Sequence, residues 1–369
     1  MKIGIDIRGL MEERYSGVSL YTLNLLHEIF RQDLKNKYVL FYNTSKEVKM
    51  PKFPYPNVKI FFTKFPNKIF NLALRFLKTP KLDVFLGNVD LLFFPNINFF
   101  AVSEKCKVVT TIHDLSFEIY PEFYSKKSRL WHRLVEPRKL CARSQKIISV
   151  SQSTKNILMD TYKISENAIR VIHSGISTTV QRVTYPEILS GVRKKYALPQ
   201  KFVLCLGNVE QRKNVGSAVS AFLSGKLPED LHLVISGNTT DKREPLGEKA
   251  NEKIHYIGYV SEGDKNALYS LSRMFLYPSY YEGFGFPPLE AMACGVPTIV
   301  SQVSSLPEVA GNASILINPN NTNDIIRAIN HLYANETLRE NLIKKGLERV
   351  KFYDWDRSAR ELLELFHSI

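Results

Sequence analysis

The fold is decided by the stretch Tyr277-Pro-Ser-Tyr-Tyr-Glu-Gly-Phe-Gly-Phe-Pro-Pro-Leu-Glu-Ala-Met-Ala-Cys-Gly-Val-Pro-Thr-Ile-Val300. The apolar run Met274–Tyr277 is typical of a buried strand, and Pro278 ends it. Pro287 and the proline after it suit a first helical turn, and Gly295 suits a C-terminal cap. Thr298–Val300 then has the composition of a second strand. The pattern therefore predicts a strand–loop–helix–strand unit.

Two glutamates, Glu282 and Glu290, flank the start of this predicted helix. Gly283 and Gly285 surround Phe284, so the backbone can approach a ligand closely. Taken singly, Glu290 could be a first-turn carboxylate that suits the helix dipole, and Glu282 a solvated loop charge. Both lie at the carboxyl end of a strand, where open α/β sheets bind ligands, and a carboxylate can accept two hydrogen bonds from a vicinal diol. For the pair, we favour a ligand site.

The segment from Glu282 to Glu290, followed by Ala-Met-Ala-Cys-Gly-Val-Pro, resembles the Glu-x7-Glu signature of the retaining nucleotide-sugar glycosyltransferases of family 4. This resemblance implies an α/β fold of two Rossmann-like domains facing across a cleft, the glycosyltransferase B architecture. It places Glu282 at the donor sugar as a catalytic residue and Glu290 at the ribose. The other donor-binding residues that it implies here are Gly283, Phe284, Gly285 and Phe286.

The chain of 369 residues is too long for one core and suits two domains. We expect an N-terminal Rossmann-like acceptor-binding domain over residues 1–175 and a nucleotide-sugar-binding domain over residues 176–350. Ile176–Gln200 is expected to act as a linker, with a short helix at Val192–Lys195. The resemblance implies that residues 351–369, with a helix over Ser358–Phe366, cross back to the first domain. Met1–Arg8 has a strand pattern rather than that of a signal peptide, so we expect a cytoplasmic protein.

The formal net charge of +14 is concentrated in the first half of the chain. Residues 1–175 hold 28 Lys and Arg against 15 Asp and Glu, whereas residues 176–369 hold 22 against 21. A nucleic acid, an anionic membrane or a phosphorylated substrate would each be attracted by such a half. We expect Lys126–Arg143 to form one long basic helix.

Pro66–Lys78 has the pattern of a basic amphipathic helix. Five apolar residues fall at helical spacing among lysines and an arginine: Ile69, Leu72, Ala73, Phe76 and Leu77. Two interpretations stay open, a helix that covers the sheet and a helix that contacts the inner face of the cell membrane.

No residue pattern predicts a metal cofactor. The cysteines Cys106, Cys141, Cys205 and Cys294 lie far apart without Cys-x-x-Cys spacing, and no strand ends in Asp-x-Asp. We therefore expect packing thiols, no metal, and a nucleotide sugar as co-substrate.

Two cations lie at a strand-to-helix junction at the start of the second half. Arg212 and Lys213 follow the predicted strand Phe202–Leu206, where cations and free backbone N–H groups can bind a diphosphate, although adjacent cations are common on any surface. The family motif matches at Arg212 and Lys213, which gives them a catalytic role, and departs at Asn208, where many members carry another arginine. By resemblance, Asn208 contacts the donor, and the donor base lies against Tyr259 and Val260.

Two candidates lie in the first half. His113 ends a predicted strand, where it could serve chemistry or be structural; the resemblance places it near the reactive face of the donor sugar. Gly17 precedes a helix predicted from Val18 to Phe30, and is either a plain loop glycine or, as the family implies, part of a glycine loop against the donor diphosphate.

The resemblance predicts a retaining glycosyltransferase that moves a hexose from a nucleotide diphosphate sugar to a glycan or lipid-linked acceptor. The sequence most resembles mannosyltransferases of surface polysaccharide synthesis, which implies GDP-mannose first and UDP-glucose or another UDP sugar second. A nucleotide-sugar epimerase or a sugar phosphorylase would use the same fold. A basic nucleic-acid-binding protein would explain the charge but not the ligand-type loops at the strand ends.

Overall fold

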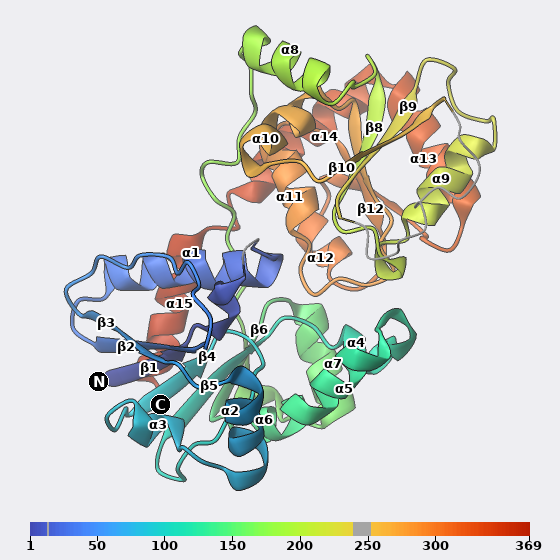
Figure 1. Ribbon diagram of the computed structural model, residues 1–369. Coiled ribbons are helices and arrows are strands. Elements are labelled where there is room, and N and C mark those ends of the chain that lie inside the picture. The colour runs from blue at the N-terminus through green and yellow to red at the C-terminus, as the bar shows by residue number, and fades with distance from the viewer. Residues whose placement is uncertain (13–14, 239–251) are drawn as a thin grey trace. The chain divides into compact units, whose positions relative to one another are not determined.

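The computed structural model describes residues 1–12, 15–238 and 252–369, and it divides into two α/β units. The first unit comprises Met1–Gly175 and Asp354–Ile369, and the second comprises Ile176–Tyr353 (Figure 1). The second unit thus extends slightly beyond the expected boundary at residue 350. Each unit is built on its own parallel sheet.

The sheet of the first unit has seven strands in the order β3-β2-β1-β4-β5-β6-β7. The strands are β1 (Lys2–Asp6), β2 (Lys37–Asn43), β3 (Val58–Thr63), β4 (Leu91–Phe94), β5 (Lys107–Ile112), β6 (Lys146–Ser149) and β7 (Ile169–Val171). Its helices and helical turns are η1 (Arg8–Met11), α1 (Gly17–Gln32), α2 (Asn67–Leu72), the π-turn η2 (Ala73–Leu77), α3 (Leu82–Phe85), α4 (Ser116–Ile119), η3 (Pro121–Phe123), α5 (Lys126–Val135), α6 (Pro137–Arg143), α7 (Gln152–Tyr162), η4 (Glu166–Ala168) and α15 (Trp355–His367). All the strand pairs are parallel, so helices must connect them and cover both faces of the sheet.

The C-terminal helix α15 completes the first unit beside α1 (Figure 1). The Asp354 side chain caps it by accepting from the N–H of Asp356, and the Ser358 hydroxyl donates to the carbonyl of His173 at 2.7 Å. Phe366 packs edge-on against Phe93 of β4, with ring centroids 5.5 Å apart. The helix begins at Trp355, three residues before the expected start at Ser358.

The basic segment from Lys126 to Arg143 forms two helices rather than the single helix expected. Glu136 adopts a left-handed conformation with φ of 55°, and Pro137 begins α6. Because the proline ring clashes with the preceding turn and lacks an N–H, the helix cannot continue through it.

The sheet of the second unit has six strands in the order β10-β9-β8-β11-β12-β13. The strands are β8 (Phe202–Leu206), β9 (His232–Ser236), β10 (Ile254–Gly258), β11 (Met274–Tyr277), β12 (Thr298–Ser301) and β13 (Ser314–Ile317). Its helices and one helical turn are α8 (Pro186–Lys195), η5 (Gln211–Lys213), α9 (Val215–Leu223), α10 (Glu262–Leu271), α11 (Phe286–Ala293), α12 (Leu306–Ala310), α13 (Thr322–Ala334) and α14 (Glu336–Val350).

The segment expected to be a linker is part of the second unit. Helix α8 starts at Pro186, which suits a first helical turn, and is longer than the predicted Val192–Lys195. At its end, the Lys195 ammonium and the Tyr196 hydroxyl both donate to Asp264 at the start of α10, at 2.6 and 2.8 Å. These contacts attach α8 to α10.

The predicted strand–loop–helix–strand unit is confirmed as β11, α11 and β12. The two strands pair in parallel, with Phe275 opposite Thr298. Gly285 precedes the helix with φ of 115°, and a Cβ there would lie 2.8 Å from Leu306 Cδ2, so only glycine fits without displacement. Gly295 follows the helix with φ of 68°, as a C-terminal cap requires.

Two further properties bear on where the protein acts. Of the helices in residues 1–12, 15–238 and 252–369, none has the length and apolar character needed to span a membrane. All four cysteines are buried and free, and burial raises the pKa of each to about 12, so they are packing thiols as expected.

Candidate active site

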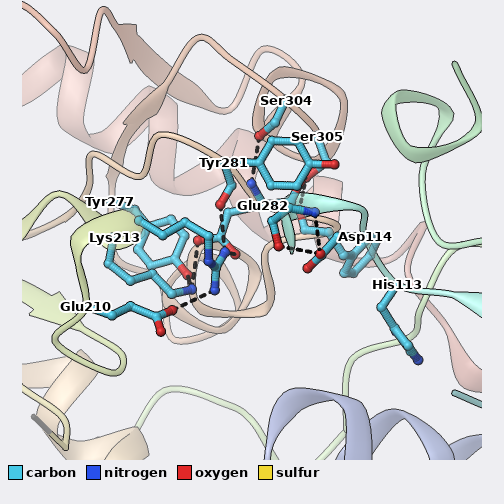
Figure 2. A network of polar contacts seen from close by, with 12 residues as sticks. His113, Asp114, Glu210, Lys213, Tyr277, Tyr281, Glu282, Ser304 and Ser305 are labelled. Atoms are coloured by element: carbon cyan, nitrogen blue, oxygen red, sulfur yellow. Dashed lines mark hydrogen bonds and ion pairs between the residues drawn. The ribbon is translucent and has the colours of Figure 1, made fainter. Parts of the chain in front are cut away.

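The loop after β11 is held rigidly by two serines that precede α12. The Ser304 hydroxyl accepts from the N–H of Glu282 at 3.0 Å (Figure 2). The Ser305 hydroxyl donates to the carbonyls of Glu282 and Phe284 at 2.9 and 2.7 Å. These three hydrogen bonds fix the backbone of the loop.

Glu282 is the centre of an ion-pair network in the second unit. Its side chain is almost completely buried, and its two carboxylate oxygens accept from Arg212 at 3.0 Å and from Lys213 at 2.7 Å. Arg212 also donates to Glu210 at 2.8 Å, and Lys213 to the Tyr277 hydroxyl at 2.6 Å (Figure 2). The interpretation of Glu282 as a solvated loop charge is wrong, because these buried charges are paired.

Electrostatics keeps Glu282 ionised. Burial alone would raise its pKa, but the charges of Arg212 and Lys213 outweigh burial and lower the pKa to about 2. Burial lowers the pKa of Lys213, although the charge of Glu282 opposes that change. Burial, with the Glu282 charge, raises the pKa of Tyr277 well above its ordinary value, so its hydroxyl keeps its proton.

Asn214 connects the strand-to-helix junction to the loop that carries Glu282. It adopts a left-handed conformation with φ of 52° directly before α9, and its side-chain amide donates to the carbonyls of Pro278 and Pro319 at 3.0 and 2.8 Å. The N–H of Tyr280 also donates to the Arg212 carbonyl at 2.9 Å. The sequence motif contained Asn214 but gave it no role; the signal was an asparagine at a helix start, a residue that tolerates positive φ.

Glu290 lies on α11 and is held by two side chains of α10. Its carboxylate accepts from the Lys265 ammonium at 2.7 Å and from the Tyr269 hydroxyl at 2.8 Å, and it is only 7% exposed. Burial lowers the pKa of Lys265, but the charges of Glu290 and Glu262 outweigh burial and leave that pKa raised. Glu290 is therefore held in a fixed position. A carboxylate that only stabilised the helix dipole would need no such buried side-chain partners. Lys265 and Tyr269 were missed from the sequence, because nothing local marks them as partners of a carboxylate 25 and 21 positions later.

The predicted base-binding and phosphate-binding residues follow two other strands of the same sheet. Asn208 is exposed just after β8. Tyr259 is 45% exposed after β10, whereas the next residue, Val260, is buried. Because parallel strands end at one edge of a sheet, these residues share the carboxyl edge with the Glu282 loop.

Phe284 and Phe286, two of the predicted donor-binding residues, pack against each other in this loop. Phe284 is buried, with its ring edge-on to Phe286 at 5.3 Å and to Tyr353 at 5.5 Å. Its ring therefore packs inside the unit and supports the loop, which leaves the backbone of Gly283–Phe286 as the part suited to contact a ligand.

His113 lies at the carboxyl end of β5 in the first unit. Its Nε2 lies 2.9 Å from the Pro95 carbonyl, which can only accept, so Nε2 carries a proton. Burial lowers the pKa of His113, and the ring is therefore neutral near pH 7 with its lone pair on Nδ1. Asp114 accepts from the N–H and hydroxyl of Ser116 and so shapes the turn that follows.

Gly17 is the first residue of α1, and Ser16 caps that helix by accepting from the N–H of Ser19 at 3.3 Å. One turn later, the Tyr21 ring meets the His113 ring edge-on at 4.6 Å. The start of α1 and His113 are therefore neighbours at one edge of the first sheet.

The site chemistry is that of charges and hydrogen bonds. In the part of the chain that the structure describes, no group of three or more His, Cys, Asp or Glu could hold a metal ion. What the second unit offers is a carboxylate–cation network, a second positioned carboxylate and the N-termini of α9 and α11.

Two family models match the chain. The model described as Glycosyltransferase Family 4 matches residues 15–180, and the model described as Glycosyl transferases group 1 matches residues 192–349. The first match lies in the first unit apart from its last few residues, and the second lies wholly in the second unit.

Curated relatives and solved structures agree with these matches. The chain is 29% identical to the O-antigen chain mannosyltransferase B of Escherichia coli over 281 residues, 73% of this chain and 72% of that protein. It is 28% identical over 270 residues to the serotype-specific mannosyltransferase WbdA of Escherichia coli, but this match spans only 33% of that protein's length. The structure of a sucrose-phosphate synthase from Thermosynechococcus elongatus has a TM-score of 0.75 at 19% identity, covering 100% of this chain and 98% of that one, a likeness of fold.

Proposed function

The chain belongs to glycosyltransferase family 4 and has the glycosyltransferase B fold, and on this premise we propose that it transfers mannose from GDP-mannose to an acceptor hydroxyl with retention of configuration. Mannose is supported by the two Escherichia coli relatives, both of which are mannosyltransferases. Since one of them is an O-antigen chain enzyme, the acceptor in this proposal is a glycan or lipid-linked glycan of surface polysaccharide synthesis.

The observation that carries the proposal is the network around Glu282. In the structure, Arg212 and Lys213 are neutralised by Glu282 and Glu210. We propose that the donor diphosphate replaces Glu282 as the partner of these cations. The released Glu282 carboxylate then accepts hydrogen bonds from hydroxyls of the donor sugar. The protein thus binds both the sugar and the diphosphate that the breaking bond joins.

Catalysis is then electrostatic. As the bond from the anomeric carbon to the diphosphate oxygen breaks, negative charge develops on the leaving group, where Arg212, Lys213 and the N-terminus of α9 stabilise it. Glu290 holds the ribose diol, and His113 contributes a neutral ring in the first unit. The acceptor hydroxyl attacks the anomeric carbon from the face that the diphosphate leaves and gives its proton to the departing diphosphate oxygen, so no covalent enzyme intermediate is required.

We propose that no metal ion takes part, because the two cations and the helix N-termini supply the positive charge that a diphosphate needs. Activity should therefore persist in excess EDTA. A complete loss that divalent metal restores would contradict this account of the leaving-group site.

We place the enzyme on the cytoplasmic side of a membrane, since four buried, free cysteines suit a reducing compartment. We propose that the first unit makes contact with that membrane.

A thermal-shift screen of nucleotide sugars tests the donor. GDP-mannose at 100 times its dissociation constant should add about 2.7 kcal/mol to the free energy of unfolding, and UDP-glucose should add less at the same concentration. Stabilisation by UDP sugars alone would replace GDP-mannose with the second predicted donor class. Consumption of donor must also require an acceptor, since an epimerase would convert the nucleotide sugar without one.

A further inference from the structure

One segment of the first unit exposes large apolar side chains. It contains α2 and the π-turn η2 and exposes Phe65 (52%), Ile69 (65%), Leu72 (49%), Phe76 (60%) and Leu77 (71%). We call these five residues the exposed apolar face. Single exposed apolar residues are ordinary on a protein surface, but five within 13 successive positions of one short segment mark an interaction site.

The opposite side of the same helix is anchored in the first unit. Phe70 and Leu74 are buried in the core that includes Phe41 of β2. The Asn43 side chain donates to that of Asn67 at 2.6 Å, at the start of α2. These contacts fix which way the helix points, so the exposed apolar face cannot turn inward to bury itself.

A salt bridge fixes the last turn of the segment. Arg75 pairs with Glu136, which lies between α5 and α6, at 2.9 Å. Arg75 therefore stabilises the fold and is not one of the exposed cations available to an anionic partner.

The stretch of sequence around the exposed apolar face is basic. No Asp or Glu occurs between Glu47 and Asp83, whereas the same stretch contains Lys49, Lys52, Lys59, Lys64, Lys68, Arg75, Lys78 and Lys81. The four lysines nearest in sequence to the face, Lys64, Lys68, Lys78 and Lys81, are exposed. A second copy of this surface would bring lysine against lysine, whereas an anionic lipid surface complements both the charge and the apolar side chains.

We propose that the exposed apolar face inserts into the surface of an anionic lipid bilayer, with the four lysines at the level of the phosphate groups. The helix then lies in the plane of the interface, and the long lysine side chains reach the headgroups while their stems stay in apolar surroundings. This deepens the proposed function, on which it rests for a reason to be at a membrane: it names the surface that brings the first unit to a lipid-linked acceptor. The sheet-covering interpretation of Pro66–Lys78 holds only for Phe70 and Leu74.

Vesicle binding of the full chain tests the inference. The wild-type protein should sediment with vesicles of phosphatidylglycerol and phosphatidylcholine, and much less with vesicles of phosphatidylcholine alone. The variant Leu72→Gln/Phe76→Gln/Leu77→Gln should lower the vesicle partition coefficient about tenfold or more, because three inserted apolar side chains are lost. All three positions are exposed, so the thermal shift of this variant with the nucleotide-sugar donor should equal that of the wild type.

Matched controls distinguish insertion of the exposed apolar face from non-specific hydrophobic adsorption to the vesicles. Ile188→Gln/Phe352→Gln removes apolar residues of similar exposure, 48% and 59%, from the second unit and should leave vesicle binding unchanged. Phe76→Trp should be quenched by lipids brominated on their acyl chains, whereas Phe352→Trp should not. Both proteins contain the same Trp131 and Trp355 as background.

Three results would overturn the inference: no binding of wild-type protein to the anionic vesicles, equal binding by the triple-glutamine variant, or a lipid-free dimer that this variant abolishes. The last result would identify a second copy as the occupant. Vesicle binding without any stabilisation by nucleotide sugars would instead contradict the proposed function and leave the membrane surface in place.

Discussion

Two basic regions, one in each unit, use positive charge in opposite ways. In the second unit Arg212 and Lys213 are mostly buried and each is paired with a carboxylate, whereas the lysines around α2 in the first unit are exposed. The first unit carries 30 Lys and Arg against 19 Asp and Glu, a difference of +11, and the second carries 20 against 17, a difference of +3. Buried cations must be paired, and their partners hold them in fixed positions. Exposed cations are solvated, so they attract anions without fixing where an anion binds. An excess of positive charge therefore indicates an interaction surface, whereas buried ion pairs indicate a binding site.

The comparison predicts its largest effect at Glu282. Glu282→Gln leaves Arg212 and Lys213 without their shared carboxylate and should lower the free energy of unfolding by about 3 kcal/mol, the cost of breaking a buried pair. Turnover should fall as well, because the neutral glutamine would accept more weakly than a carboxylate from the donor-sugar hydroxyls that Glu282 is proposed to bind. Denaturant unfolding and the transfer rate measure the two effects.

Glu210→Gln is the matched control, since Glu210 pairs with Arg212 at the edge of the network and is more exposed than Glu282. Its effect on stability should be clearly smaller. Equal effects of the two substitutions would mean that position at the centre of the network does not matter.

The same network predicts an acid-dependent loss of stability. The pKa of Glu282 is about 2 in the folded protein and about 4.3 when unfolded, so its contribution is complete above the unfolded value and is lost as the pH falls from about 4.3 to about 2. The pKa difference corresponds to about 3 kcal/mol, at about 1.4 kcal/mol for each unit. Unfolding measured at pH 5 and pH 3 should show a smaller decrease for Glu282→Gln than for the wild type. Identical decreases would place the titrating group elsewhere.

Glu290 should affect ligand binding more than the fold. Glu290→Gln keeps the shape and removes the charge proposed to hold the ribose diol, so donor affinity should fall by about 1.5–3 kcal/mol. Lys265→Met, which removes the ammonium that positions this carboxylate, should weaken donor binding in the same direction but less. Calorimetry with the donor measures both, and unchanged binding by Glu290→Gln would reduce Glu290 to a partner of Lys265 and Tyr269.

Local sequence signals made part of this structure predictable. The prolines and Gly295 around α11 set the boundaries of the β11–α11–β12 segment, and these signals act over a few residues. The burial of Glu282 was not predictable, because its partners lie about 70 positions earlier and meet it only through the pairing of β11 with β8. Pairing between distant segments leaves no local sequence signal.

The helix at α2 shows a different limit. Apolar residues occur on several sides of it, so periodicity could not choose which of them the sheet would bury. The sheet takes Phe70 and Leu74, and the residues at the noticed spacing, Ile69, Leu72, Phe76 and Leu77, stay outside. Contacts with distant residues decide the orientation, among them those with Phe41 and Asn43 and the Arg75–Glu136 pair.

The smallest effects should come from single exposed lysines, which differ most from the buried, paired cations Arg212 and Lys213. Lys68→Gln removes one solvated charge beside the exposed apolar face and should weaken binding to anionic vesicles by about 1 kcal/mol or less, with no change in stability or donor affinity. The loss should shrink at high salt, because screening removes the same term. Lys351→Gln, an exposed lysine of the second unit, is the control and should bind vesicles like the wild type. If Lys68→Gln weakened binding as much as the triple-glutamine variant, attachment would be electrostatic, and insertion of the apolar side chains would not be its basis.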